Sequence, residues 1–238
     1  MNKLRAFLLR RRIRNVIGQA EPAFVISDVL ERRKVLLVSL AKGLLGAEAA
    51  SLLGSLVIAQ CWQAIQARAG VAPEQRAPVF LYLDEFQDYL ALQLDLGDVL
   101  AQARGFRVGL MLAHQHLGQL NNAVRQAVLS NARSRVVFET AADDAPTLAR
   151  ALGRPVTADD LQALPAYEVY ASLCADGHVT EPVSLRTFPL PPGRNVAPKV
   201  RARSRDRYGR DRTEIETAIA ARRESPPDGP VGRRRRTP

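Results

Sequence analysis

Two adjacent carboxylates, Asp84 and Glu85, are the residues of this sequence best placed to do chemistry. They directly follow an apolar run, residues 79–83, which is typical of a buried strand. In open α/β sheets ligands bind at the carboxyl ends of strands, so both acids would emerge where a ligand can reach them. Asp84 could then hold Mg²⁺ and Glu85 could polarise an attacking water. The alternative is a helix or turn cap with solvated acids, because an apolar run followed by Asp-Glu also occurs by chance.

A side-chain amide, Gln115, follows a second apolar run at residues 108–113. If the two runs are neighbouring parallel strands, Gln115 lies beside Glu85. An amide there can contact both a γ-phosphate and the attacking water, and can couple hydrolysis to movement of the strand. Taken alone, Gln115 is more simply a surface residue at the start of a loop. The two signals together are much more specific than either one.

Four arginines flank the expected strand ends and are candidates for a finger that reaches the nucleotide of a neighbouring subunit: Arg104, Arg107, Arg133 and Arg135. Arg104 is the first choice because it precedes the strand that carries Gln115. At least two of the four must be ordinary surface charges. His114 and His116 bracket Gln115, but no spacing supplies a third metal ligand, so structural histidines are favoured.

The sequence contains no phosphate-binding loop of the Walker A type. That motif ends in Gly-Lys-Ser/Thr, because backbone amides and the lysine together cradle the phosphates. The chain has four lysines, Lys3, Lys34, Lys42 and Lys199, and none of them follows a glycine. We therefore expect that these residues alone do not bind ATP in the usual way.

The elements that would position these residues alternate between short apolar runs and longer helical patterns, which predicts parallel strands joined by crossover helices. Strands are expected at 34–39, 79–83, 108–113 and 135–139, followed by a hairpin formed by 167–173 and 178–183. Helices are expected at 47–69, 96–104, 122–129 and 143–152. This order predicts a doubly wound, mostly parallel α/β sheet with helices on both faces.

The net charge of +10 is concentrated at the two ends of the chain. Residues 1–14 carry six basic groups and no acid, residues 189–238 have a net charge of +8, and residues 15–188 have a net charge of −4. The segment after Phe188 is rich in proline and arginine and poor in apolar residues, so we expect a disordered basic tail with at most a short helix at 214–223. It could contact phosphates, or it could serve solubility or partner binding. The arginines proposed to contact nucleic acid are Arg201, Arg203, Arg205, Arg233, Arg234, Arg235 and Arg236.

The composition favours one core in a reducing compartment. Cys61 and Cys174 lie apart inside apolar runs, which indicates neither a disulfide framework nor a zinc site. The basic N-terminus lacks the apolar region and cleavage site of an export signal. The most apolar stretch, 44–65, contains Glu48, and its uncharged part is shorter than the ~20 residues of a membrane span, so a buried helix is predicted.

In combination, these motifs resemble the C-terminal part of the HerA/FtsK-type P-loop ATPases, and most closely the TraD/TraG-like coupling proteins of conjugation and type IV secretion. The resemblance covers residues 1–188 and is specific only as a set. The segments that carry it are 2–8, 34–46, 53–56, 83–87 (Leu-Asp-Glu-Phe-Gln), 104–115 and 130–138.

The resemblance implies a RecA-like fold, incomplete on its N-terminal side, in a hexameric ring that moves DNA with ATP and Mg²⁺. Asp84 and Glu85 would take the Walker B roles, with Asp84 at the metal, and Gln115 the sensor role. Family members carry the Walker A loop upstream, so we expect a truncated or split gene, or a partner chain that supplies the loop. We also expect a cytoplasmic chain, peripheral at the inner membrane through other segments or proteins of a secretion complex.

The predicted organisation is a basic helix and linker at 1–33, the C-terminal half of an ATPase domain at 34–188, and a tail at 189–238. Two functions remain open. The first is a partial ATPase motor domain for DNA transfer, inactive without its missing half. The second is a non-catalytic scaffold subunit or truncated remnant that binds DNA or a partner through its basic ends. A Gly-Lys-Ser/Thr loop encoded just upstream of Met1 would favour the first.

Overall fold

The computed structural model describes residues 10–90 and 96–224 of the chain, which forms two compact units. The smaller unit consists of Met1–Val25, Ala41–Ala49 and Arg194–Pro238. The larger unit consists of Ile26–Leu40 and Ala50–Gly193. Both strands that were expected to end in functional side chains belong to the larger unit.

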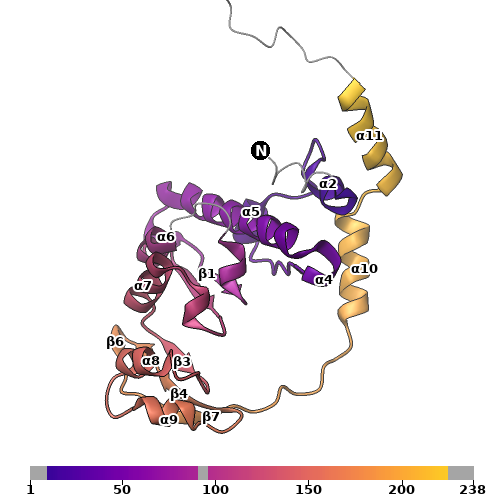
Figure 1. Ribbon diagram of the computed structural model, residues 1–238. Coiled ribbons are helices and arrows are strands. Elements are labelled where there is room, and N and C mark those ends of the chain that lie inside the picture. The colour runs from indigo at the N-terminus through magenta and orange to yellow at the C-terminus, as the bar shows by residue number, and fades with distance from the viewer. Residues whose placement is uncertain (1–9, 91–95, 225–238) are drawn as a thin grey trace, which may run out of the picture. The chain divides into compact units, whose positions relative to one another are not determined.

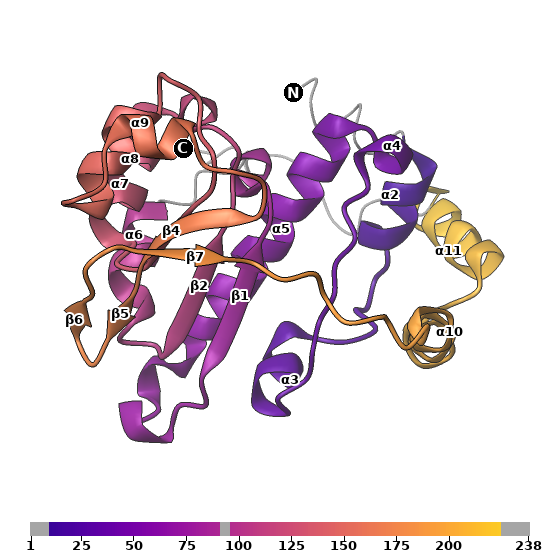
Figure 2. The ribbon, with the colours of Figure 1, turned by 90° about the horizontal axis from the view of Figure 1, so that it is seen from below.

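The centre of the larger unit is a pair of parallel strands, β1 (Val79–Leu83) and β2 (Val108–Leu112). Their register runs from Val79 opposite Val108 to Leu83 opposite Leu112, so both carboxyl ends lie at one edge of the sheet. Figure 2 shows the two strands side by side. The predicted parallel arrangement of these two strands is therefore confirmed.

The helices of the larger unit follow the predicted order. The long helix α5 (Ala47–Gln66) belongs to this unit from Ala50 onward. The others are α3 (Ile26–Glu31), α6 (Leu96–Ala103), α7 (Asn122–Asn131), α8 (Ala145–Leu152) and α9 (Ala158–Gln162). The four predicted helices are confirmed with ends that differ by a few residues, as is usual for helix boundaries.

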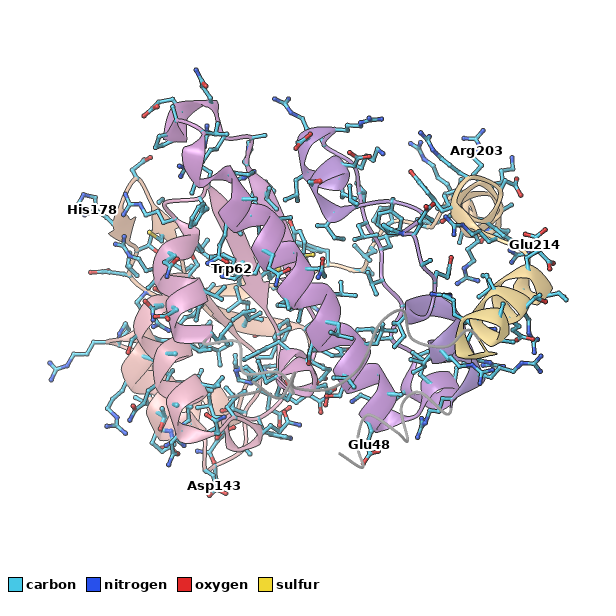
Figure 3. All side chains as sticks on the ribbon, turned by 90° about the horizontal axis from the view of Figure 1, so that it is seen from above. Glu48, Trp62, Asp143, His178, Arg203 and Glu214 are labelled. Atoms are coloured by element: carbon cyan, nitrogen blue, oxygen red, sulfur yellow. The ribbon has the colours of Figure 1, made fainter. Side chains whose placement is uncertain are left out.

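A hydrophobic core joins α5, α6 and the parallel pair. Trp62 of α5, labelled in Figure 3, packs edge-on against Phe106, with ring centroids 5.9 Å apart. The buried members of this core are Trp62, Ile65, Val79, Phe86, Leu96, Val99, Ala103, Val108, Leu117 and Leu120. Helix α5 is thus a core helix, as predicted, and none of the helices in the described ranges has the length and apolarity that crossing a membrane requires.

A separate antiparallel sheet has the order β3-β4-β7, with β3 (Arg135–Val137), β4 (Glu168–Ser172) and β7 (Val183–Arg186). A short hairpin of β5 (Cys174–Ala175) and β6 (His178–Val179) follows β4. The prediction that residues 135–139 extend the parallel sheet is therefore wrong. Val137 is buried in a second cluster with Ala145, Ala149 and Leu152 of α8, and this burial comes with antiparallel pairing to β4.

The strand predicted at 34–39 is also absent, because this segment has no regular secondary structure. Val35 and Leu37 are 85% and 81% exposed. Their apolar character indicated a buried strand, but a strand requires a hydrogen-bonded neighbour, and no strand of the described chain pairs with this segment. The chain is therefore a mixed α/β protein with small sheets rather than one extended parallel sheet.

The smaller unit is helical, with α2 (Arg11–Ile17), α4 (Lys42–Leu45), α10 (Ala197–Tyr208) and α11 (Arg212–Glu224). Glu216 of α11 accepts hydrogen bonds from Arg11 and Asn15 of α2, and these bonds hold the pKa of its carboxyl far below the usual range. Arg222 donates to the carbonyl of Gly18 at 2.6 Å. Residues from the two ends of the sequence therefore pack together within this unit.

The predicted disorder of the tail is wrong for residues 197–208 and 212–224, which form α10 and α11, two successive helices in Figure 1. The short helix that was allowed at 214–223 lies within α11. Local signals start both helices. Pro198 occupies the first turn of α10, and the Asp211 carboxylate accepts from the backbone N–H groups of Thr213 and Glu214 at the start of α11. Contacts of α11 with α2 add tertiary support that composition could not indicate. The basic residues before Arg10 and the run Arg233–Arg236 lie outside the described residues.

Candidate functional site

The carboxyl ends of β1 and β2 continue into two segments, 84–89 and 113–117, which we call the carboxyl rim. The backbone ladder extends into the rim, because Ala113 N–H donates to the Leu83 carbonyl at 3.0 Å and Phe86 N–H to the Ala113 carbonyl at 3.2 Å. The Phe86 side chain is almost fully buried. The two segments are therefore held at a fixed distance from each other by backbone bonds and by the core.

Glu85 is bound by two side-chain amides at this rim. Gln115 Nε2 donates to Glu85 Oε1 at 2.5 Å, and Gln87 Nε2 donates to Glu85 Oε2 at 2.5 Å. The expectation that Gln115 lies beside Glu85 is thus met by the geometry. Gln87 was not predicted as a site residue, although it closes the Leu-Asp-Glu-Phe-Gln segment at 83–87 that carries the resemblance.

The backbone at Glu85 is left-handed, with φ 50° and ψ 47°. This region is uncommon for a residue with a side chain and costs on the order of 1 kcal/mol. The turn η3 (Phe86–Tyr89) begins at the next residue. The left-handed residue therefore turns the chain sharply at the end of β1, so that residue 87 can return its side chain to residue 85.

Helix α5 holds the far end of this turn in place. Ser51 donates a hydrogen bond to the Asp88 carbonyl, and the buried Ser55 donates to the Tyr89 carbonyl at 2.8 Å. Gly54 lies between these serines, and a Cβ atom there would overlap the Tyr89 ring. Residues 53–56 (Leu-Gly-Ser-Leu) of α5 therefore position the rim, because the helix packs closely against the turn η3.

Asp84 is exposed, and within residues 10–90 and 96–224 it has no hydrogen-bond or ion-pair partner. Mg²⁺ sites in nucleotide-binding proteins use one or two carboxylates together with phosphate oxygens and waters. A free carboxylate at the strand end fits such a site. No cluster of three or more metal-ligating side chains occurs in the described part of the chain.

His114 lies against the rim, with its ring 5.6 Å from that of Phe86. Burial lowers its pKa, and the nearby Asp144 and Glu85 only partly oppose that shift. Its Nδ1 atom is buried without a partner in the described chain. Asp144 accepts from the Leu117 N–H at 2.8 Å. A neutral, packed histidine fits the structural role that was favoured from the sequence.

The four candidate arginines differ in what they contact. Arg107 donates to the Glu74 carbonyl at 3.2 Å, Arg133 to Gly177 at 2.5 Å and Arg135 to Leu129 at 2.6 Å. Burial also lowers the pKa of Arg135. Arg104 is exposed, and its guanidinium has no hydrogen-bond partner in the described chain. It precedes β2 and so lies at the edge opposite the carboxyl rim, where it cannot reach the rim of its own chain.

Helix α10 carries a dense positive charge. All five of its basic side chains are exposed, and none forms an ion pair within the described ranges. These residues are Lys199, Arg201, Arg203, Arg205 and Arg207. Figure 3 labels Arg203, with nitrogen-tipped side chains extending away from the helix.

Comparison with known proteins identifies the family. The family model described as Type IV secretory system Conjugative DNA transfer matches residues 12–162. Among solved structures, the chain is similar to the plasmid coupling protein TrwB in complex with the non-hydrolysable GTP analogue GDPNP, with 17% sequence identity and a TM-score of 0.44. That match covers 56% of this chain and 37% of the TrwB chain, so this chain spans well under half the length of that relative. No curated protein sequence matches significantly.

The family match spans β1, β2 and the whole carboxyl rim, and it extends through α9. It covers more than half of the sequence. The chain therefore belongs to the type IV secretory system conjugative DNA transfer family.

Proposed function

We propose that this chain is the Walker B and sensor half of a RecA-like ATPase motor that moves DNA in conjugation or type IV secretion. The observation that carries the proposal is the hydrogen bond from Gln115 to Glu85 across two parallel strand ends. A carboxylate and an amide in contact at the carboxyl edge of a sheet match the groups needed to orient a water against a γ-phosphate. Family membership supports the assignment to DNA transfer.

Three residues of the rim have proposed roles in hydrolysis. Asp84, the free carboxylate, helps to hold Mg²⁺ through water. Glu85 orients the attacking water and accepts its proton as the water oxygen bonds to the γ-phosphorus. The bond from that phosphorus to the bridging oxygen breaks, and the nucleoside diphosphate leaves with the electron pair. Gln115 contacts the γ-phosphate and couples its hydrolysis to movement of β2.

The nucleotide also needs a phosphate-binding loop, and none of the four lysines of this chain follows a glycine. We propose that a segment outside these residues supplies the loop, either joined to this chain or as a partner chain. The resemblance to hexameric motors implies that a neighbouring subunit contributes an arginine finger. Arg104 remains the candidate because its guanidinium has no partner in the described chain and because it precedes β2, at the edge of the sheet opposite its own rim.

DNA is the proposed partner of the basic segments. Helix α10 presents Arg201, Arg203 and Arg205 without ion pairs in the described chain, so their charges are available to phosphates. In contrast, Arg11 and Arg212 both form ion pairs with Glu216, whose negative charge partly compensates their positive charges. The run Arg233–Arg236 remains a predicted contact.

The alternative is a non-catalytic scaffold subunit that keeps the sheet and binds DNA or a partner. Its support is the missing Gly-Lys-Ser/Thr sequence. The two functions are separated by joining or mixing the chain with the segment encoded upstream, provided that this segment contains a phosphate loop, and measuring phosphate release with DNA present. Hydrolysis that requires both parts supports the motor. A mixture that binds DNA but releases no phosphate would support the scaffold.

A further inference from the structure

The two carboxylate oxygens of Glu85 accept from amides that differ in how firmly they are held. Gln115 is exposed and lies beyond the last residue of β2. Gln87 is half-buried inside the turn η3, whose ends are fixed on both sides. One amide can therefore leave Glu85 by a side-chain rotation at the surface, whereas the other is held by its surroundings.

Backbone contacts fix the position of Gln87. The preceding residue, Phe86, is in the core, and the Asp88 N–H donates to the Glu85 carbonyl at 3.0 Å. Ser51 and Ser55 of α5 bind the next two carbonyls. The Gln87 side chain thus starts from a backbone that cannot shift without breaking contacts with the core and with α5.

The orientation of the Gln87 amide is set by chemistry. A carboxylate only accepts hydrogen bonds, so Nε2 must face Glu85 and Oε1 must face away. Oε1 is buried and has no partner in the described chain. The hydrogen bond to Glu85 therefore fixes which way the amide is turned.

We propose that Gln87 is a positioning residue that keeps the Glu85 carboxylate aimed at the attacking water while Gln115 exchanges its bond to Glu85 for one to the γ-phosphate. This inference rests on the proposed function. If Gln115 alone held Glu85, sensing the phosphate would release the carboxylate at the moment when it must be oriented. With Gln87 in place, one oxygen of Glu85 stays bound throughout the exchange.

The first test uses the assembled protein, the chain together with the phosphate-loop segment. We expect Gln87→Leu to lower kcat by about 10- to 100-fold with KM within about twofold, because the lost contact acts in the transition state. Gln60→Leu is the matched control. It makes the same change at an exposed glutamine of α5 and should leave kcat unchanged.

Gln87→Glu gives a readout that a merely structural role would not produce. Two adjacent carboxyls share one proton, and the shared proton restores the hydrogen bond to Glu85. We therefore expect this variant to regain activity relative to wild type as the pH is lowered, whereas Gln87→Leu stays low at every pH. If the activity of Gln87→Glu relative to wild type depends on pH in the same way as that of Gln87→Leu, the proposal is overturned.

A second measurement needs no nucleotide. In NMR spectra of the chain alone, Glu85→Gln should shift the side-chain amide resonances of both Gln87 and Gln115, and unmoved Gln87 resonances would overturn the proposal. If the assembled wild type hydrolyses ATP and Glu85→Gln does not, while Gln87→Leu keeps the wild-type kcat, only the role of Gln87 fails. If the assembled wild type hydrolyses nothing, the proposed function fails and the inference fails with it.

Discussion

The carboxyl rim and helix α10 use charge in opposite ways. At the rim, Glu85 is bound on both oxygens, and its backbone is fixed by the core and by α5. On α10, five basic side chains extend into solvent with no ion pair in the described chain. The proposed function of the rim therefore depends on where the Glu85 carboxylate is held, whereas that of α10 depends on the density of its positive charge. A small displacement of the Glu85 side chain should inactivate the rim, whereas DNA binding by α10 should tolerate any single substitution.

Replacing Glu85 by Gln should have the largest effect. The variant keeps the size of the side chain but loses the proton acceptor, so phosphate release by the assembled protein should fall about 10²- to 10⁴-fold. Glu74→Gln on the exposed 3-10 turn η2 (Pro73–Gln75) is the control and should stay at the wild-type rate. Wild-type turnover by the Glu85→Gln variant would mean that Glu85 takes no part in hydrolysis, which would contradict the role proposed for the rim.

Reversing charges on α10 tests whether its positive charge binds DNA. The triple change of Arg201, Arg203 and Arg205 to Glu should weaken duplex DNA binding at least tenfold at low salt and flatten the salt dependence of the binding constant, because phosphate contacts are lost. Each single change should cost much less. Fluorescence anisotropy at several salt concentrations measures both effects.

The control for α10 has the same change in net charge elsewhere. Arg32, Arg125 and Arg150 are exposed residues of the larger unit, and their reversal to Glu should weaken binding only slightly. Equal losses in the two triple variants would mean that net charge, and not the helix, governs binding.

Gly54→Ala tests whether the rim depends on the close approach of α5. Alanine normally favours a helix by up to ~1 kcal/mol over glycine. Here the added Cβ would overlap the Tyr89 ring, so a net loss of about 1–2 kcal/mol in the free energy of unfolding is expected. Gly70→Ala, where a Cβ would meet nothing within 4 Å, is the control. Urea denaturation of both variants should separate them, and equal stabilities would contradict the close approach.

His114 should produce a smaller, pH-dependent effect. Burial lowers its pKa in the folded chain, so the unfolded chain binds the proton more readily. The contribution to stability is intact above the unfolded pKa of about 6.5 and is lost as the pH falls from there toward the folded pKa. Asp144, Glu85 and His116 also act on this ring.

His114→Gln removes this titration and should flatten the acid dependence of the unfolding temperature between about pH 7 and pH 5. His178→Gln, at the exposed hairpin, should leave that dependence unchanged. An unaltered acid dependence in His114→Gln would show that other groups govern it.

The prediction of the rim succeeded because strand, acid pair and amide are encoded within short segments. The apolar runs fixed β1 and β2, and the residue after each run fixed what emerges at its end. Gln87 was missed because its role depends on a left-handed turn at Glu85, a conformation that no residue type in that segment indicates. The same apolar signal failed at Val35 and Leu37, since a strand also needs a partner.

The sequence by itself determined the charged ends, the core helix α5, the strand-acid and strand-amide motifs, and the absence of a Gly-Lys pair, because each of these is a local property of neighbouring residues. Only the tertiary structure decided that β3 pairs antiparallel with β4, that α11 binds α2 through Glu216, and that two amides share one carboxylate. These outcomes depend on contacts between distant segments. The free energy of such contacts depends on geometry that composition and periodicity do not contain.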